Sequence, residues 1–160
     1  MSRADDATGP VPSPQPWGWF EPTPAQLREK LTATRARCGE DSVEYAFVLV
    51  ELGDAHMVQG RLSNPAAQAS YETALKIFQT EGQETPEVAW LYDKLANVKQ
   101  SSGDTFGAEA DLKKALALWQ DRPPDKLRWA LRDDHLTRRE EDLERLRKVN
   151  AFKNRKPPEL

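Results

Sequence analysis

A segment of this chain repeats itself, and the repeat limits the choice of fold more than any other feature. Residues 39–60 align without a gap on residues 82–103, and the glycines at both ends of the two segments coincide. The alignment then resumes with two extra residues in the first copy, so that Ala67, Tyr71 and Ala74 meet Ala108, Leu112 and Ala115. Self-similarity at a period of about 20–50 residues is typical of solenoids, propellers and arrays. We therefore expect copies of one unit stacked on each other.

Start and stop signals divide the chain into six helices, and no stretch has the alternation of a strand. Glycines at 39, 60 and 103 follow helix-compatible stretches, as is usual where helices end. Capping patterns predict helix starts at Ser42, with Asp41 and Glu44 as a capping pair, at Asn64–Pro65, at Thr85–Pro86, and at Asp104 or Thr105. The expected helices are 25–36, 42–59, 64–78, 85–103, 104–120 and 125–149.

These helices predict an all-α fold, a short α-solenoid of antiparallel helix pairs. A half-repeat at 25–38 precedes two repeats at 42–80 and 85–120, and a charged C-terminal helix within 122–150 caps the array or binds a partner. The ends differ in character. Residues 1–24 contain six prolines, which favours an extended arm, and residues 151–160 form a basic tail.

Small and large apolar residues recur at matching positions of the two copies. Close packing where two helices cross leaves room only for small side chains. The small positions are Gly53, Ala67, Ala74, Ala96, Ala108 and Ala115. The larger residues expected to fill the core are Leu49, Leu52, Tyr71, Leu75, Phe78, Leu91, Leu95, Leu112, Leu116 and Trp119.

The spacing of these residues resembles the tetratricopeptide repeat, whose pattern is W-x2-L-G-x2-Y, then A-x3-F, then Ala. The first copy matches it with Leu49, Leu52, Gly53, His56, Ala67, Tyr71 and Ala74. The second copy has Tyr92, Leu95, Ala96, Lys99, Ala108, Leu112 and Ala115 in those slots. The long stretch between the copies is similar to the long-repeat variant of kinesin light chains. The resemblance implies a module that holds other proteins and does not catalyse a reaction.

In arrays of this kind the first helix of each pair lines a concave groove. The resemblance therefore implies a partner-binding surface at Phe47, Val50, Asp54, Met57, Trp90, Asp93, Asn97 and Gln100. The alternative is that Phe47 and Trp90 simply pack against neighbouring helices. Val50, Asp54 and Asp93 occupy slots where a receptor for chaperone tails needs basic or amide side chains, which disfavours that function.

Catalytic and metal-binding patterns do not occur in the sequence. His56 falls in an aromatic slot of the repeat, where packing is expected, and His135 is adjacent to two aspartates that do not share its helix face. Cys38 is the single cysteine and has no local activating group. The chain has no GxGxxG, GxxxxGK[ST], HExxH or GxSxG motif. We expect no enzyme, no metal and no cofactor.

The two ends of the chain are the other candidate contact regions. The arm carries Trp17, Trp19 and Phe20, a cluster of apolar area that a solvated tail has little reason to expose, so these residues are predicted to bind a partner. Residues 138–156 contain eight basic and four acidic residues, which favours an internally paired helix surface over contact with RNA or lipid. A formal net charge of −3 also argues against general nucleic-acid affinity.

The expected function is that of a structural or scaffold subunit whose partners are other proteins of a larger assembly. The alternative is an adaptor that captures a short peptide in the groove. No apolar run approaches the length of a membrane span, and the N-terminus has neither a secretory nor a transit pattern. We expect a cytoplasmic protein, or else one in an organelle such as the mitochondrion.

Overall fold

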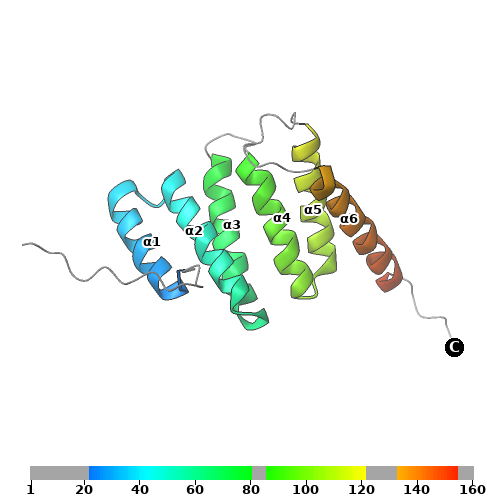
Figure 1. Cartoon of the computed structure of the whole chain (residues 1–160), viewed down its shortest axis with the longest axis horizontal. Coiled ribbons are helices and arrows are strands. Elements are labelled where there is room, and N and C mark those ends of the chain that lie inside the picture. Colours follow the sequence, from blue (N-terminus) through cyan, green and yellow to red (C-terminus); the bar gives the residue numbers. More distant parts are fainter. Residues whose placement is uncertain (1–21, 81–85, 122–132, 155–160) are drawn as a thin grey trace, which may run out of the picture.

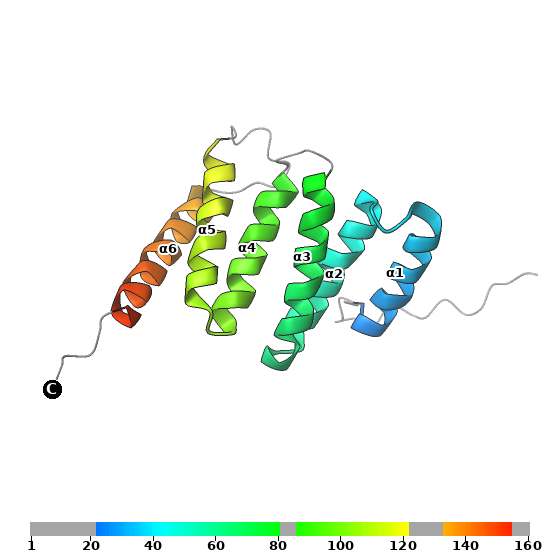
Figure 2. The same ribbon diagram turned by 180° about the vertical axis from the view of Figure 1, so that it is seen from behind.

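Six α-helices make up the part of the protein that this computed structural model describes, residues 22–80, 86–121 and 133–154. They are α1 (Pro24–Cys38), α2 (Val43–Val58), α3 (Asn64–Thr80), α4 (Pro86–Ser101), α5 (Thr105–Gln120) and α6 (Asp133–Lys153), with a 3-10 turn, η1 (Arg61–Ser63), before α3. Those ranges contain no strand. Each helix packs against the next, and the helices form a row along the long axis of the molecule (Figure 1, and from behind in Figure 2). The predicted all-α, solenoid-like fold is confirmed.

Some sequence predictions fall on residues outside the described ranges. The aromatic arm with Trp17, Trp19 and Phe20 precedes Pro22, the first described residue. The predicted start of the last helix at residue 125 falls within 122–132, and most of the basic tail falls within 155–160.

Polar side chains cap the first backbone N–H groups of α1 and α5, which have no partner inside the helix. Thr23 Oγ1 accepts a hydrogen bond from the Gln26 N–H at 3.3 Å, and Gln26 Oε1 accepts one from the Thr23 N–H at 2.9 Å. This reciprocal pair is a capping box. Asp104 Oδ1 accepts from the Gly107 N–H at 2.8 Å, so the predicted cap of α5 is confirmed.

The cap of α2 differs from the prediction. Ser42 has an extended backbone directly before the first helical residue, and its Oγ accepts a hydrogen bond from the Tyr45 N–H at 3.2 Å. Asp41 lies one residue too early to take that role. The predicted capping pair of Asp41 and Glu44 is therefore wrong, because the cap is the next residue, Ser42, and its partner is Tyr45.

Asn64 was also expected to cap its helix, but it is the first residue of α3 and is buried. Its Nδ2 donates hydrogen bonds to Ser101 Oγ at 2.7 Å and Ser102 Oγ at 3.1 Å. The side chain thus ties the start of α3 to the end of α4, a contact over 37 residues that no local pattern indicates.

The glycines that close the two aligned segments have the same backbone conformation. Gly60 follows α2 with φ 97°, and Gly103 follows α4 with φ 89°. Residues with a side chain rarely adopt a positive φ of this size, whereas glycine adopts it at no steric cost. The repeat in the sequence is therefore also a repeat of the turn that leads from one helix of a pair to the other.

The residues that the repeat predicted for the core are buried. Ala67, Ala74, Ala108 and Ala115 are fully buried, and Ala96 is 3% exposed. The ten larger residues expected in the core are all buried, at 9% exposure or less. All of them except Leu52 belong to two apolar clusters, one around α2, α3 and α4 and the other around α4, α5 and α6. The predicted stacking of helix pairs through small residues is confirmed.

The last helix runs to Lys153 and not to the predicted end near Val149. Asn150 is 3% exposed, and its Nδ2 donates to Thr105 O at 3.0 Å and to Glu109 Oε2 at 2.7 Å. Lys153 Nζ donates to Thr105 Oγ1 at 2.8 Å. These contacts with α5 stabilise the final turn of α6, which sequence analysis had assigned to the tail from residue 151.

Candidate partner-binding surface

Basic side chains link α2, α4 and α6 to one another on one side of the row. Lys94 Nζ of α4 lies 2.6 Å from Asp54 Oδ1 of α2. Arg139 Nε of α6 lies 2.9 Å from Asp93 Oδ1 of α4. We call the surface that α2, α4 and α6 form here the inner face. These two ion pairs tie α4 to α2 on one side and to α6 on the other, so the four charged groups are paired within the chain.

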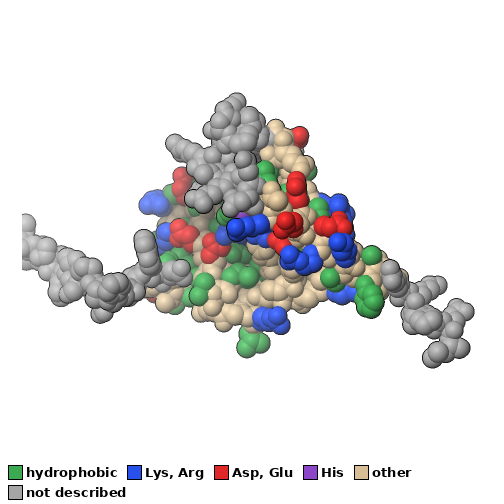
Figure 3. Space-filling view, turned by 45° about the vertical axis from the view of Figure 1, so that its right-hand side comes forward, with side chains coloured by type: hydrophobic (Ala, Val, Ile, Leu, Met, Phe, Trp, Pro, Cys, Tyr) green, Lys and Arg blue, Asp and Glu red, His purple; other side chains and the backbone are tan. Residues whose placement is uncertain are grey.

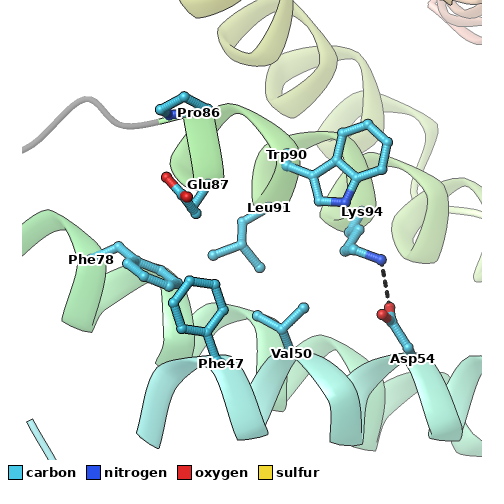
Figure 4. A pocket seen from close by; sticks show the side chains of 9 residues that line it. All are labelled: Phe47, Val50, Asp54, Phe78, Pro86, Glu87, Trp90, Leu91 and Lys94. Atoms are coloured by element: carbon cyan, nitrogen blue, oxygen red, sulfur yellow. Dashed lines mark hydrogen bonds and ion pairs between the residues drawn. The ribbon is translucent and has the colours of Figure 1, made fainter. Parts of the chain in front are cut away.

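A hollow of about 240 Å³ opens on the inner face between α2 and α4 (Figure 4). It is lined by Phe47, Val50, Asp54, Phe78, Pro86, Glu87, Trp90, Leu91 and Lys94. Figure 4 shows the rings of Phe47 and Phe78 together on one side, Trp90 across the hollow from them, and the Asp54–Lys94 ion pair at one end. Small-molecule sites usually enclose about 300–1,000 Å³. The hollow is smaller and mainly apolar, which suits one bulky side chain of a bound segment.

At the polar end of the hollow, Tyr71 and Lys94 both contact the carboxylate of Asp54. Tyr71 Oη donates a hydrogen bond to Asp54 Oδ1 at 2.5 Å, and Lys94 approaches the same oxygen. Burial raises the pKa of Tyr71, and the neighbouring Asp54 raises it further, so the phenol keeps its proton and remains a donor. The Lys94 ammonium also lies 5.7 Å from the Tyr71 ring centre and 5.8 Å from that of Trp90, in cation–π range.

Aligned aromatic pairs stand at equivalent places in the two repeats. Phe47 and Phe78 meet edge to face with ring centres 5.3 Å apart, and the aligned residues Trp90 and Trp119 are 6.2 Å apart. In the second repeat the His135 ring of α6 packs on this pair, 5.6 Å from Trp90 and 5.3 Å from Trp119. The pair in the first repeat borders the hollow instead.

Four of the eight residues predicted on the groove line the hollow, namely Phe47, Val50, Asp54 and Trp90. Phe47 is 43% exposed and Trp90 37% exposed, although each also packs on an aromatic neighbour. The packing interpretation of these two residues is supported, and their contact with a partner stays a prediction. Met57 and Gln100 follow later in α2 and α4 and are not part of the lining.

The other two predicted groove residues, Asp93 and Asn97, contact α6. Asp93 is 3% exposed and paired with Arg139, and Arg139 Nη1 donates to Asn97 Oδ1 at 3.4 Å. Burial raises the pKa of Asp93 despite the opposing effect of Arg139. The resemblance to tetratricopeptide repeats implied an open groove at these residues, and the last helix was expected to cap the array or to bind a partner. In the structure α6 lies beside α4 and covers them.

Sequence analysis missed five lining residues: Phe78, Pro86, Glu87, Leu91 and Lys94. Phe78 and Leu91 were assigned to the core, where they are indeed 5% and 1% exposed, and they also border the hollow. Lys94 could have been predicted beside Trp90, because it lies four residues later and so one turn along the same helix face.

The described residues offer no group of three His, Cys, Asp or Glu side chains placed to hold a metal ion. His56 is 6% exposed within α2, and Cys38 is exposed as the last residue of α1. None of the described helices combines the length and apolar character needed to cross a membrane.

The sequence was compared with protein-family models and with curated proteins, and neither comparison gave a match.

Proposed function

We propose that this chain is a protein–protein interaction module without catalytic activity, built from tetratricopeptide-like repeats and serving as a structural or scaffold subunit of a larger assembly. The repeat pattern and the stacked helix pairs with buried small residues support the repeat type. The ion pairs of the inner face support a non-catalytic role, since their charges join one helix to the next and do not converge on a reaction centre.

The observation that carries the scaffold proposal is uncovered apolar surface at the α6 end of the row. Val149 and Phe152 of α6 are 39% and 73% exposed, and Phe106 of α5 is 47% exposed. Phe106 follows Thr105, which accepts hydrogen bonds from the last turn of α6, so the three side chains lie at the same end. Repeat arrays bury such surface against a further neighbour, and contiguous exposed apolar patches mark interaction sites.

The charged surface of α6 favours a protein partner over a nucleic acid. Figure 3 shows basic and acidic side chains intermixed on this side of the molecule, not a basic stripe. Arg145 pairs with Asp142 at 2.9 Å, and Lys148 lies 3.7 Å from Glu144. Phosphate backbones are bound by unneutralised Lys and Arg, and these residues already have acidic neighbours.

The hollow favours the alternative function, an adaptor that captures a short peptide. Its apolar lining and the half-exposed rings of Phe47 and Trp90 would take a bulky side chain from a partner segment. In this case the partner contacts lie between α2 and α4, far along the row from the exposed side chains of α6.

Two pairs of surface substitutions distinguish these functions. The tagged full-length chain is expressed in its own cells as wild type, as Val149→Ser/Phe152→Ser and as Phe47→Ala/Trp90→Ala. Gel filtration of the extract and crosslinking mass spectrometry then measure its size and contacts. A scaffold subunit leaves its large complex when the α6 pair is changed and stays there when the hollow pair is changed. An adaptor shows the reverse. A wild-type chain that migrates as a free monomer would contradict both.

A further inference from the structure

The described row of helices begins and ends on half of a repeat unit. α1 has the place of a second helix, because the alignment of residues 39–60 with 82–103 also matches α1 with α3, the helix that precedes residue 82. α6 has the place of a first helix, since it follows α5, the second helix of a pair. Among the described residues no helix precedes α1 and none follows α6, and the two lie at opposite ends of the row (Figure 1 and Figure 2). Each end therefore lacks a neighbour that the inner helices have.

The alignment gives the register of α1. At the offset that matches residue 39 with residue 82, Leu27 matches Ser70 of α3, and Thr34 matches Ile77. All four are buried, at 8% exposure or less. The side of α1 that packs on α2 thus corresponds to a buried side of α3.

Two arginines of α1 stand where α3 packs on the first helix of its own pair. Arg28 matches Tyr71, and Arg35 matches Phe78. Both aromatic residues are buried and contact α2, with the Tyr71 ring directly against Gly53. The two arginines are exposed. Arg35 has an ion pair with a neighbouring glutamate, whereas the guanidinium of Arg28 forms none with the described residues.

Contacts between successive first helices give the register of α6. Asp54 of α2 and Asn97 of α4 are aligned, and a basic side chain of the next first helix contacts each of them. Lys94 of α4 contacts Asp54, and Arg139 of α6 donates a hydrogen bond to Asn97. Arg139 therefore matches Lys94.

In this register, two glutamates of α6 stand where α4 packs on the second helix of its pair. Glu141 has the place of Ala96, and Glu144 has the place of Lys99, two α4 residues that contact α5. Both glutamates are exposed. Glu144 lies 3.7 Å from Lys148, whereas the carboxylate of Glu141 has no ion pair or hydrogen bond within 22–80, 86–121 and 133–154.

We propose that the chain associates end to end with a second copy of itself, with α6 of one copy and α1 of the next packed as an antiparallel helix pair. In the first repeat, Gly53 of the first helix meets Tyr71 of the second. The matching places at the two ends of the row hold Glu141 and Arg28. Two copies joined in the arrangement of an inner repeat therefore bring these opposite charges together.

The inference goes beyond the proposed function, because it requires no other protein and uses charged side chains, not Val149 and Phe152. A contact between different surfaces of two copies continues into a row or closes into a ring. Exposed ion pairs are weak and are screened by salt. We therefore expect reversible association that grows with protein concentration and falls with salt.

Analytical ultracentrifugation of the purified full-length chain tests the association. The average mass should rise with protein concentration in about 10 mM salt, where charges act over about 30 Å, and return to that of the monomer in about 1 M salt, where they act over about 3 Å. Glu141→Arg and Arg28→Glu should each abolish the rise, because each places like charges opposite each other. The matched controls Glu72→Arg in α3 and Arg61→Glu in η1 change the net charge equally, lie inside the row, and should leave the rise unchanged.

Mixing the two end variants provides the second measurement. Equal amounts of Glu141→Arg and Arg28→Glu chains should regain the association of the wild type, because each end of one variant then meets the opposite charge on the other. Circular dichroism checks that each variant remains helical, and if one unfolds, the salt series on the wild type decides the question.

Three results would overturn the proposal. The first is a wild-type chain that stays monomeric at every concentration in low salt. The second is association that the end variants do not regain on mixing. The third is a loss of association with Glu141→Arg but not with Arg28→Glu, which would place the contact between two copies of α6.

Discussion

Gly53→Ala probes the closest approach between helices in the first repeat. A Cβ at this position would lie 2.4 Å from Tyr71 Cε1 and 2.7 Å from Cδ1, distances at which atoms overlap. The ring cannot swing aside freely, because it is 2% exposed and its hydroxyl is bonded to Asp54. The aligned slot in the second repeat holds Ala96, and there the position that matches Tyr71 is Leu112. The glycine is therefore needed for the tyrosine ring.

The size of the effect follows from two opposing contributions. Overpacking a core costs about 1–3 kcal/mol, and alanine gains about 1 kcal/mol over glycine inside a helix. If the ring moves, the bond from Tyr71 to Asp54 is lost as well, and because that carboxylate is 47% exposed the loss is nearer about 1 kcal/mol than the value for a buried charge. We expect a net loss of about 1–2 kcal/mol in the free energy of unfolding. In a chain of this size that lowers the melting temperature by about 2–8 °C.

Urea and thermal unfolding followed by circular dichroism measure this loss. The Tyr71→Leu background is the control, since it gives the first repeat the residue that the second repeat already has. Gly53→Ala should be neutral or stabilising there, because the atoms it would overlap are gone. An equal loss in both backgrounds, or a variant at least as stable as the wild type, would refute the explanation.

Three further predictions concern polar contacts. Tyr71→Phe should lower the free energy of unfolding by about 1 kcal/mol in urea titrations, since only its hydrogen bond to Asp54 is removed. Arg139→Ala should cost about 3 kcal/mol in the same assay, because it leaves the buried Asp93 carboxylate unpaired, and adding Asp93→Asn should recover part of that loss. Hydrogen bonds from Lys113 and Asn150 lower the pKa of Glu109 below its ordinary value of 4.5. A lowered folded-state pKa stabilises the fold above the unfolded-state value, so the advantage of wild type over Glu109→Gln should be full near neutral pH and disappear as the pH falls through the folded-state pKa.

The helix order and the core could be predicted because their signals are local or periodic. Asp104 caps α5 as its sequence context indicated, and the aligned glycines at 60 and 103 close their helices in the same conformation. The predictions for Asn64 and for the end of α6 were wrong because contacts with other helices, and not the local sequence, determine the structure there. Asn64 has the chemistry of a cap but bonds to the end of α4, and α6 continues past its predicted end because Asn150 is held by α5.

The sequence by itself determined that this protein is all-α, that two units are stacked, and which small residues lie where their helices cross. These properties depend on spacing within a helix or on comparison of one copy with the other. Only the tertiary structure showed which polar groups of the inner face are paired with each other within the chain. Tyr71 bonds to Asp54 across 17 residues, and Arg139 of α6 covers Asp93, so these groups serve the chain itself. Such pairs follow no period, because they depend on how helices already folded lie against each other. The hollow beside Phe47 and Trp90 is likewise the space that remains after α2, α3 and α4 have packed.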